Sequence, residues 1–207
     1  GVGKEREPRF DRIPGISVSG FFPCAYRMYR VHTGEVYGEE LTPQQILNMD
    51  DGWTHEEQAV SRYAKIGIAI ENRDNRRVVV GKSNIYGSYD GRVTLNGQRY
   101  LWEFKAMNTD RFWEFKRWGL KAFPGYMAQV QGYMVGSGDS EAIFQAKHKD
   151  SNDYYDIVVP LDIPYISQII QWVDDIKLKN WIPEPKECEY CYYCGLKCFG
   201  TTLDFSW

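Results

Sequence analysis

Two helical patterns precede the strand-rich middle of the chain. An apolar-periodic segment over residues 43–49 has a proline at the first helical position, where its missing N–H is tolerated. The pair Asp51-Gly52 is expected to end this helix. Thr54 then begins a second helix, because Glu57 lies three residues on and completes a capping box. The apolar face of this second helix would carry Ala59, Val60, Tyr63 and Ala64.

A long β-hairpin gives the clearest pattern, with strands expected over residues 85–95 and 98–106. Asn96-Gly97 joins the two strands, and this pair favours the positive φ angles of a two-residue hairpin turn. Because side chains alternate along a strand, one face of the hairpin can pack into a core. We expect that face to carry Val93, Tyr100, Trp102 and Phe104.

Two carboxylates face each other across this hairpin. The turn puts Asp90 opposite Glu103, with Cβ atoms roughly 5 Å apart, and Lys105 shares their face. Opposed carboxylates repel unless a cation lies between them, and their hard oxygens suit Mg²⁺ or Mn²⁺. A nearby lysine can orient or deprotonate a water, or neutralise charge that develops on a phosphate. The alternative is a surface hairpin with a weak salt bridge between Glu103 and Lys105.

The rest of the chain alternates between strand and helix patterns. The valine run at 78–80 predicts a strand, and Asp162 is expected to cap a helix. Further helices are expected over 110–120 and 125–135, and further strands near 142–147 and 154–159. No repeat or linker interrupts this order, so we expect one α/β domain over residues 1–207.

Composition and charge narrow the class of protein. With 207 residues, 43% of them hydrophobic, the chain can bury a real core, which excludes a disordered protein. The net charge of −3 excludes a binder whose whole surface is basic, but it allows an enzyme with a local basic groove. No apolar run approaches the roughly 20 residues of a membrane span. The first residues show no apolar signal region, so a cytoplasmic location is expected.

Five cysteines are distributed unevenly. Cys24 stands alone, whereas Cys188, Cys191, Cys194 and Cys198 lie in the run CEYCYYCGLKC. An odd count without a secretory signal argues against disulfides, and thiolates at this spacing converge on a soft metal centre. Two arrangements remain open: a local zinc site of the four clustered cysteines, or a site that Cys24 completes with three of them. Spacing alone leaves the metal and its four ligands undecided.

The order of these residues resembles a known nuclease superfamily. Asp90, followed by Glu103 and Lys105 in an E-x-K strand, matches the D…E-x-K pattern of the PD-(D/E)XK nucleases, and GSYDG with YLWEFKAM is similar to their RecB-type branch. That branch also has an upstream histidine on a helix and a downstream Q-x-x-x-Y on a helix. The matching residues here are His55 in DGWTHEEQ and Gln129 with Tyr133 in AQVQGYM.

An iron–sulfur sub-branch of this superfamily, which includes CRISPR-associated exonucleases and AddB-type helicase–nucleases, extends the resemblance to residues 17–200. Its first cluster cysteine matches Cys24 in FFPCAYRMYR, and its other three lie in the C-terminal tail. The tail departs from the family spacing because Cys194 is an additional cysteine. The resemblance implies a 4Fe–4S cluster, with zinc as the alternative, formed by residues 17–30 and 183–200. The implied ligands are Cys24, Cys188, Cys191 and Cys198, with Cys194 as the alternative to Cys198.

For the catalytic site, the resemblance implies a restriction-endonuclease-like core in which a mixed central sheet is flanked by helices. His55, Asp90 and Glu103 would hold Mg²⁺ or Mn²⁺, and the carbonyl of Phe104 would be a further ligand. Lys105 would help to activate the attacking water. Gln129 and Tyr133 would support the site or contact DNA, whereas Glu56, next to the histidine, is expected to be a solvated helix residue.

The function implied is that of a metal-dependent DNA exonuclease acting on single-stranded DNA or DNA ends. Its context would be recombination, repair or CRISPR spacer acquisition, with CRISPR integrase or recombination proteins as partners. A non-catalytic iron–sulfur or zinc module that binds nucleic acid is the alternative. The aromatic residues after the E-x-K strand, which are Phe112, Trp113 and Trp118, are expected to pack in the core rather than stack on bases.

Overall fold

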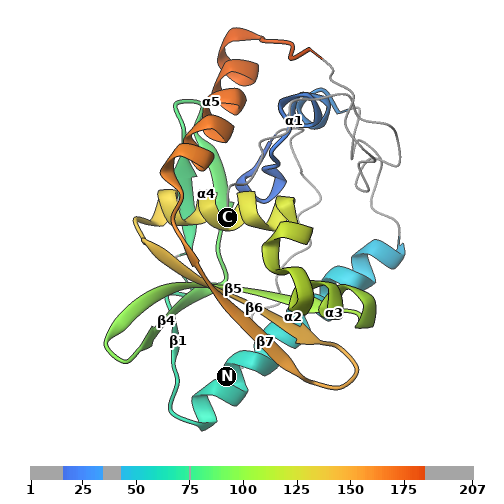
Figure 1. Ribbon diagram of the computed structural model, residues 1–207, viewed down its shortest axis with the longest axis vertical. Helices are drawn as coiled ribbons and strands as arrows, with labels where there is room; N and C mark the ends of the chain where they lie inside the picture. Colours follow the sequence, from blue (N-terminus) through green and yellow to red (C-terminus); the bar gives the residue numbers. More distant parts are fainter. Residues whose placement is uncertain (1–15, 35–42, 75, 185–207) are drawn as a thin grey trace.

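A mixed five-stranded sheet forms the centre of the molecule. The computed structural model describes residues 16–34, 43–74 and 76–184 (Figure 1). In the sheet the strand order is β1-β4-β5-β6-β7, with β5 and β6 parallel and the other neighbours antiparallel. The bounds are β1 (Ile70–Glu71), β4 (Gly91–Leu95), β5 (Gln98–Met107), β6 (Glu141–His148) and β7 (Tyr154–Pro160). The predicted α/β fold with a mixed central sheet flanked by helices is confirmed.

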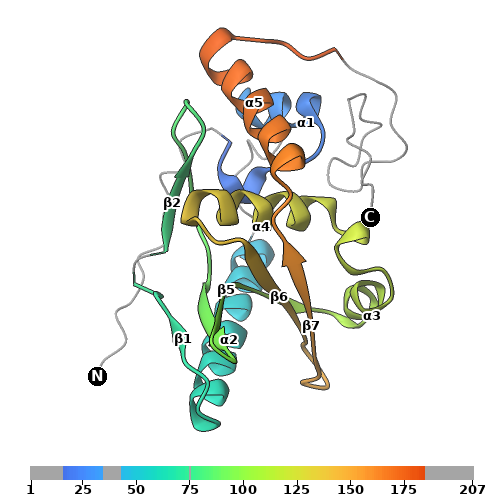
Figure 2. The same ribbon diagram turned by 60° about the vertical axis from the view of Figure 1, so that its left-hand side comes forward.

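Helices cover both faces of this sheet (Figures 1 and 2). On one face α2 (Pro43–Lys65) packs over a small core. The buried residues of that core are Ala59, Val93, Trp102, Phe104 and Ile143. On the other face a larger core includes residues from α1 (Ala25–His32), α3 (Thr109–Trp118), α4 (Pro124–Ser137) and α5 (Ile163–Lys179), with short 3₁₀ turns at Val18–Gly20 and Gly119–Ala122. The side chains of β5 therefore enter two different cores in alternation.

The hairpin of β4 and β5 has the predicted register. Leu95 pairs with Gln98 and Gly91 pairs with Trp102. The turn residues Asn96 and Gly97 both have positive φ, of 51° and 81°, as a two-residue hairpin turn requires. Gly91 is needed where β4 begins, because a Cβ atom there would lie 2.5 Å from a methyl carbon of Ile70.

The first strand of the hairpin is shorter than expected. Residues 85–88 form a separate strand, β3 (Ile85–Ser88), which pairs with β2 (Arg77–Val80) in a two-stranded sheet of its own. The chain therefore leaves one sheet and enters the other at Tyr89-Asp90. Asp90 continues the pairing with its side chain, since its Oδ2 accepts a hydrogen bond of 2.8 Å from the backbone N–H of Phe104.

The expected break at Asp51-Gly52 is wrong, because α2 runs through it without interruption. A single glycine costs a helix only about 1 kcal/mol, which tertiary packing overrides. Thr54 is not an N-cap either, since its hydroxyl donates to the carbonyl of Asp50 within the helix. As a result, His55 and Glu56 lie in the middle of a long helix and not in a first turn.

A buried carboxylate attaches the β2–β3 hairpin to the helical layer. Asp174 of α5 accepts hydrogen bonds from the backbone N–H groups of Lys82 and Ser83, both 2.8 Å, and from the Ser83 hydroxyl. Gly81 has a φ of +71°, and a Cβ atom there would lie 2.8 Å from Asp174 Oδ1. This attachment fixes the segment that leads from β3 into Asp90.

The remaining predicted elements are confirmed, with small shifts at their ends. The expected helices of 110–120 and 125–135 correspond to α3 and α4, and the expected strands near 142–147 and 154–159 to β6 and β7. Asp162 caps α5 by accepting a hydrogen bond from the N–H of Tyr165. Among the described helices, none is long and apolar enough to cross a bilayer.

Candidate active site

A buried carboxylate and a lysine lie side by side on β5. Glu103 is 1% exposed, and its Oε1 accepts a hydrogen bond of 2.5 Å from Lys105 Nζ. The two residues are two positions apart, so they share a face of the strand. The other carboxylate oxygen of Glu103, Oε2, is buried and has no hydrogen-bond partner within the described part of the chain. An unsatisfied carboxylate oxygen is costly to bury and suggests that a ligand outside the protein completes the site.

Asp90 faces this pair from the start of β4. Its Oδ2 accepts a hydrogen bond from the N–H of Phe104, the residue between Glu103 and Lys105. Burial, reinforced by the negative charge of Asp90, raises the pKa of Glu103 to about 8. The structure thus brings together the three residues of the predicted D…E-x-K site. The N–H and C=O of a strand residue point to the same side, so the carbonyl of Phe104 is directed toward the Asp90 side of β5.

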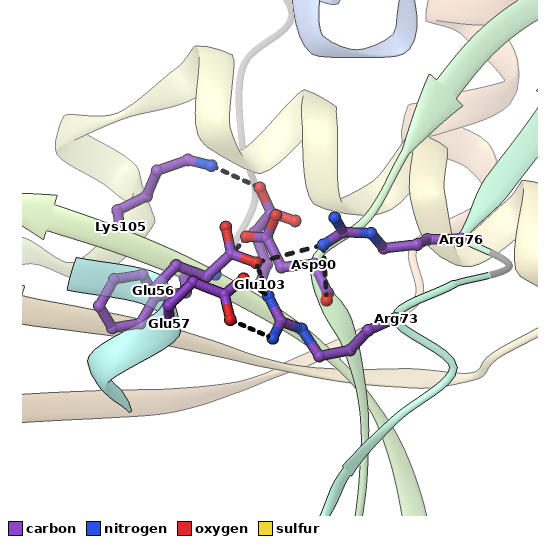
Figure 3. Close-up of polar contacts among 8 residues, drawn as sticks. Glu56, Glu57, Arg73, Arg76, Asp90, Glu103 and Lys105 are labelled. Carbon is purple, nitrogen blue, oxygen red and sulfur yellow. Dashed lines mark hydrogen bonds and ion pairs between the residues drawn. The ribbon is translucent and has the colours of Figure 1, made fainter. Parts of the chain in front are cut away.

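A third carboxylate, from Glu56 on α2, belongs to the same group (Figure 3). Glu56 is 8% exposed, and burial together with the charge of Asp90 raises its pKa. Its Oε1 accepts from Arg73 Nη2 at 2.7 Å and from Arg76 Nη1 at 3.1 Å. The expectation that Glu56 is a solvated helix residue is therefore wrong.

The hydrophobic periodicity of the sequence already places Glu56 on the inward face of its helix. Glu56, Ala59 and Tyr63 are spaced i, i+3 and i+7, which places the glutamate on the predicted apolar face of the helix. Ala59 is buried under α2, and Tyr63 packs against the same core. An acidic residue on an inward helix face needs a partner or a ligand. The two arginines that provide it follow α2 in the sequence, in the segment between β1 and β2.

His55 lies elsewhere. Its Nδ1 is 2.6 Å from Lys147 Nζ of β6, and its Nε2 is 3.5 Å from Asp51 Oδ1. Burial, together with the positive charge of Lys147, lowers the pKa of this imidazole. No described contact joins His55 to Asp90 or Glu103. Its role as a metal ligand stays a prediction, and a neighbouring ammonium group is unfavourable for a cation there.

Gln129 and Tyr133 form a hydrogen-bonded pair on α4, as their i, i+4 spacing predicts. Gln129 Nε2 donates to the Tyr133 hydroxyl at 3.0 Å, and both side chains are buried. Burial and the negative charge of Glu103 raise the pKa of Tyr133, which places this pair in the electrostatic field of the site. Lys105 Nζ also lies 5.5 Å from the ring centre of Tyr126 on the same helix. Helix α4 therefore borders the site on the side of Lys105.

These residues suit a divalent cation. The hard oxygens of Asp90 and Glu103, the unsatisfied Oε2 of Glu103 and the raised pKa of that carboxyl all favour added positive charge. Among the described side chains, no three His, Cys, Asp or Glu are already arranged as a complete metal site. The two carboxylates would therefore need backbone oxygen or water as further ligands, which Mg²⁺ accepts readily.

The predicted iron–sulfur site lies largely outside the described residues. Cys188, Cys191, Cys194 and Cys198 all fall in the segment that the structure does not describe. Cys24 is buried and forms no disulfide with the described residues, and its Sγ accepts from the N–H of Arg27 at the start of α1. The cluster and its ligand set stay predictions.

Glu103 should make the stability of the metal-free protein depend on pH. Its folded-state pKa of about 8 exceeds the ordinary 4.5, so between these values the folded state binds more protons than the unfolded chain. The free energy of unfolding then falls as pH rises, by up to ~1.4 kcal/mol per pH unit. We expect the Tm in EDTA to decrease from about pH 5 to about pH 8. Thermal unfolding followed by circular dichroism measures it.

The Glu103→Gln variant should show a flatter Tm profile and a higher Tm at the alkaline end. Glu56 shifts in the same direction, so part of the slope will remain. Glu114→Gln, at an exposed position of α3, is the matched control and should follow the wild type. An unchanged slope in Glu103→Gln would show that this carboxyl titrates normally.

Comparisons with known proteins show that the chain has the α/β fold of an exonuclease of known structure. That protein is the alkaline exonuclease LHK-Exo from Laribacter hongkongensis, with a TM-score of 0.57 and 19% identity over 81% of this chain and 88% of that chain. LHK-Exo in complex with dAMP matches with a TM-score of 0.55 and 22% identity over 73% and 75% of the two chains. No protein family and no curated protein matches the sequence.

Proposed function

We propose that this chain is a metal-dependent DNA exonuclease that hydrolyses phosphodiester bonds at DNA ends or in single-stranded DNA. One observation supports this most strongly: on the fold shared with an alkaline exonuclease, Glu103 and Asp90 face each other beside Lys105, and one buried oxygen of Glu103 has no protein partner among the described residues. Glu56 adds a third carboxylate beside Asp90, whose charge contributes to its raised pKa.

Each residue has a role that follows from its position. Asp90 and Glu103 hold the cation, with the carbonyl of Phe104 as a further oxygen ligand. Bound Mg²⁺ or Mn²⁺ would supply an activated water and screen the charge on the phosphate. Burial disfavours the charged form of Lys105, but the negative charges of Glu103 and Asp90 have the larger effect, and the pKa of Lys105 is raised. Lys105 therefore stays protonated, and it orients the attacking water or neutralises charge developing on the phosphate.

Several finer features belong to the same proposal. Gln129 and Tyr133, hydrogen-bonded to each other on α4, would support the site or contact DNA. The C-terminal cysteines with Cys24 would bind a 4Fe–4S cluster, or zinc, that ties the two ends of the chain together. The enzyme would act in recombination, repair or CRISPR spacer acquisition, with integrase or recombination proteins as partners.

A nuclease assay tests this proposal. The full chain, purified without oxygen, is incubated with end-labelled single- and double-stranded DNA in Mg²⁺, Mn²⁺ or EDTA. We expect metal-dependent shortening that Glu103→Gln abolishes and Glu114→Gln retains, because Glu103 is buried in the site and Glu114 is exposed on α3. The fate of the label gives the polarity of digestion. DNA binding without cleavage in the wild-type protein would favour the non-catalytic binding module instead.

A further inference from the structure

Two arginines converge on a single oxygen of Glu56. Arg73 Nη2 and Arg76 Nη1 both donate to Glu56 Oε1, at 2.7 Å and 3.1 Å. Arg73 also donates to both carboxylate oxygens of Glu57, with its Nη1 2.9 Å from Oε2. Arg76 Nη1 donates as well to the backbone carbonyl of Asp90, at 3.2 Å. The two guanidinium groups thus connect α2 to the start of β4 (Figure 3).

These ion pairs are partly shielded from water. The side chains of Arg73 and Arg76 are 19% and 13% exposed, and that of Glu56 is 10% exposed. Charge-assisted hydrogen bonds in such an environment are much stronger than at an open surface, and a carboxylate is not easily withdrawn from them. Glu56 is consequently a poor candidate for direct coordination of a cation, although it lies beside Asp90.

The charges around the site are already nearly balanced. Four carboxylates, from Glu56, Glu57, Asp90 and Glu103, face three cationic groups, from Arg73, Arg76 and Lys105. Glu56 and Glu57 are neutralised by the arginines, which leaves Asp90 and Glu103 as the carboxylates with charge available for a metal. Lys105 offsets one of these two negative charges, so a single divalent cation already exceeds the charge that remains. A second cation beside Glu56 would in addition meet two guanidinium groups at close range.

We propose that the site takes one divalent cation, at Asp90 and Glu103, and that Arg73 and Arg76 are positioning residues that keep Glu56 out of its coordination shell. The arginine pair supplies the positive charge that a second cation at Glu56 would otherwise supply. The inference rests on the proposed function, because it concerns the metal of that same site.

A Mn²⁺ titration without DNA tests it, with free and bound Mn²⁺ measured by electron paramagnetic resonance on the full chain. Any cysteine-bound metal is quantified separately, and only EDTA-removable Mn²⁺ is counted. Wild type should bind one equivalent, and Asp90→Asn should lose it. The double variant Arg73→Gln/Arg76→Gln should gain a second equivalent because Glu56 is released, and adding Glu56→Gln should remove that gain. Arg77→Gln, at an exposed position of β2, should keep one equivalent.

Each outcome decides between the two proposals. Two equivalents in the wild type, or no gain in the folded double variant, would overturn the role of the arginines and leave the metal-dependent nuclease intact. No binding in the wild type would count against the proposed metal site itself. If the double variant fails to fold, Glu56→Gln alone decides: one equivalent with unchanged affinity supports the inference, and loss of binding overturns it.

Discussion

Replacement of Lys105 by alanine should slow DNA hydrolysis by about 100- to 1,000-fold, which corresponds to ~3–4 kcal/mol of transition-state stabilisation. The ammonium group lies 2.5 Å from Glu103 Oε1 and is held protonated by the surrounding carboxylates. It can therefore stabilise charge on the reacting phosphate from a fixed position, and no other described lysine or arginine contacts Glu103. Single-turnover cleavage of end-labelled DNA at saturating Mn²⁺ measures the chemical step.

The variant should retain its fold and its affinity for DNA, because Lys105 is one positive charge among many and Glu103 can become protonated when its partner is removed. Circular dichroism and a binding assay in Ca²⁺ check both points. Lys65→Ala, at the exposed end of α2, is the matched control and should cleave like the wild type. A cleavage rate within a few-fold of the wild type would remove Lys105 from the mechanism.

Local patterns were sufficient to predict the β5 side of the site. The Asn96-Gly97 turn fixed the register of β4 and β5, and the register placed Glu103 and Lys105 on one face. The switch of the chain from β3 to β4 at Asp90 was not predicted, since it depends on pairing between β2 and β3. Asp90 nevertheless faces Glu103. Its side-chain Oδ2 accepts the hydrogen bond of the Phe104 N–H, and this bond keeps Asp90 beside β5 where the backbone pairing of β4 has ended.

The α2 side of the site was not predicted, for a different physical reason. A capping-box pattern at Thr54 suggested a helix start, but packing over the small core keeps α2 continuous through Gly52. Both His55 and Glu56 turn toward the sheet, and the rotation of the whole helix sets which groups each of them meets. Lys147 and Arg76, the partners that distinguish the two residues, lie 92 and 20 positions away in the sequence. Such long-range pairs have no signature in a local pattern.

The aromatic residues of α3 divide into two groups that the sequence did not separate. Phe112 is buried, as expected, and so is Phe115, whereas Trp113 and Trp118 are 52% and 60% exposed. The expectation that both tryptophans pack in the core is therefore wrong. On a ten-residue amphipathic helix, neighbours one position apart point in different directions, so a single residue step separates a core side chain from an exposed one.

Phe115→Ala should lower the free energy of unfolding by ~3–5 kcal/mol, the largest stability loss that we expect from α3. The ring is fully buried, and its centre lies 5.3 Å from that of Phe144, 5.8 Å from that of Tyr155 and 6.1 Å from that of Phe123. Truncation removes its apolar burial and leaves a cavity, because β-strand neighbours cannot easily move to fill it. Chemical denaturation at equilibrium measures the change.

Trp113→Ala is the matched control two residues away, and it should lower the unfolding free energy by no more than about 1 kcal/mol because half of its surface is already in water. Both variants remove a large aromatic ring from the same helix, but only the Phe115 ring is buried. The difference between their stability losses therefore measures the effect of burial. Equal losses would mean that Trp113 is covered in solution. Phe144 pairs with Glu103 across β5 and β6, so the cavity in Phe115→Ala opens close to the strand that carries Glu103. We therefore expect the stability loss to be accompanied by weaker Mn²⁺ binding, whereas Trp113→Ala should bind Mn²⁺ normally.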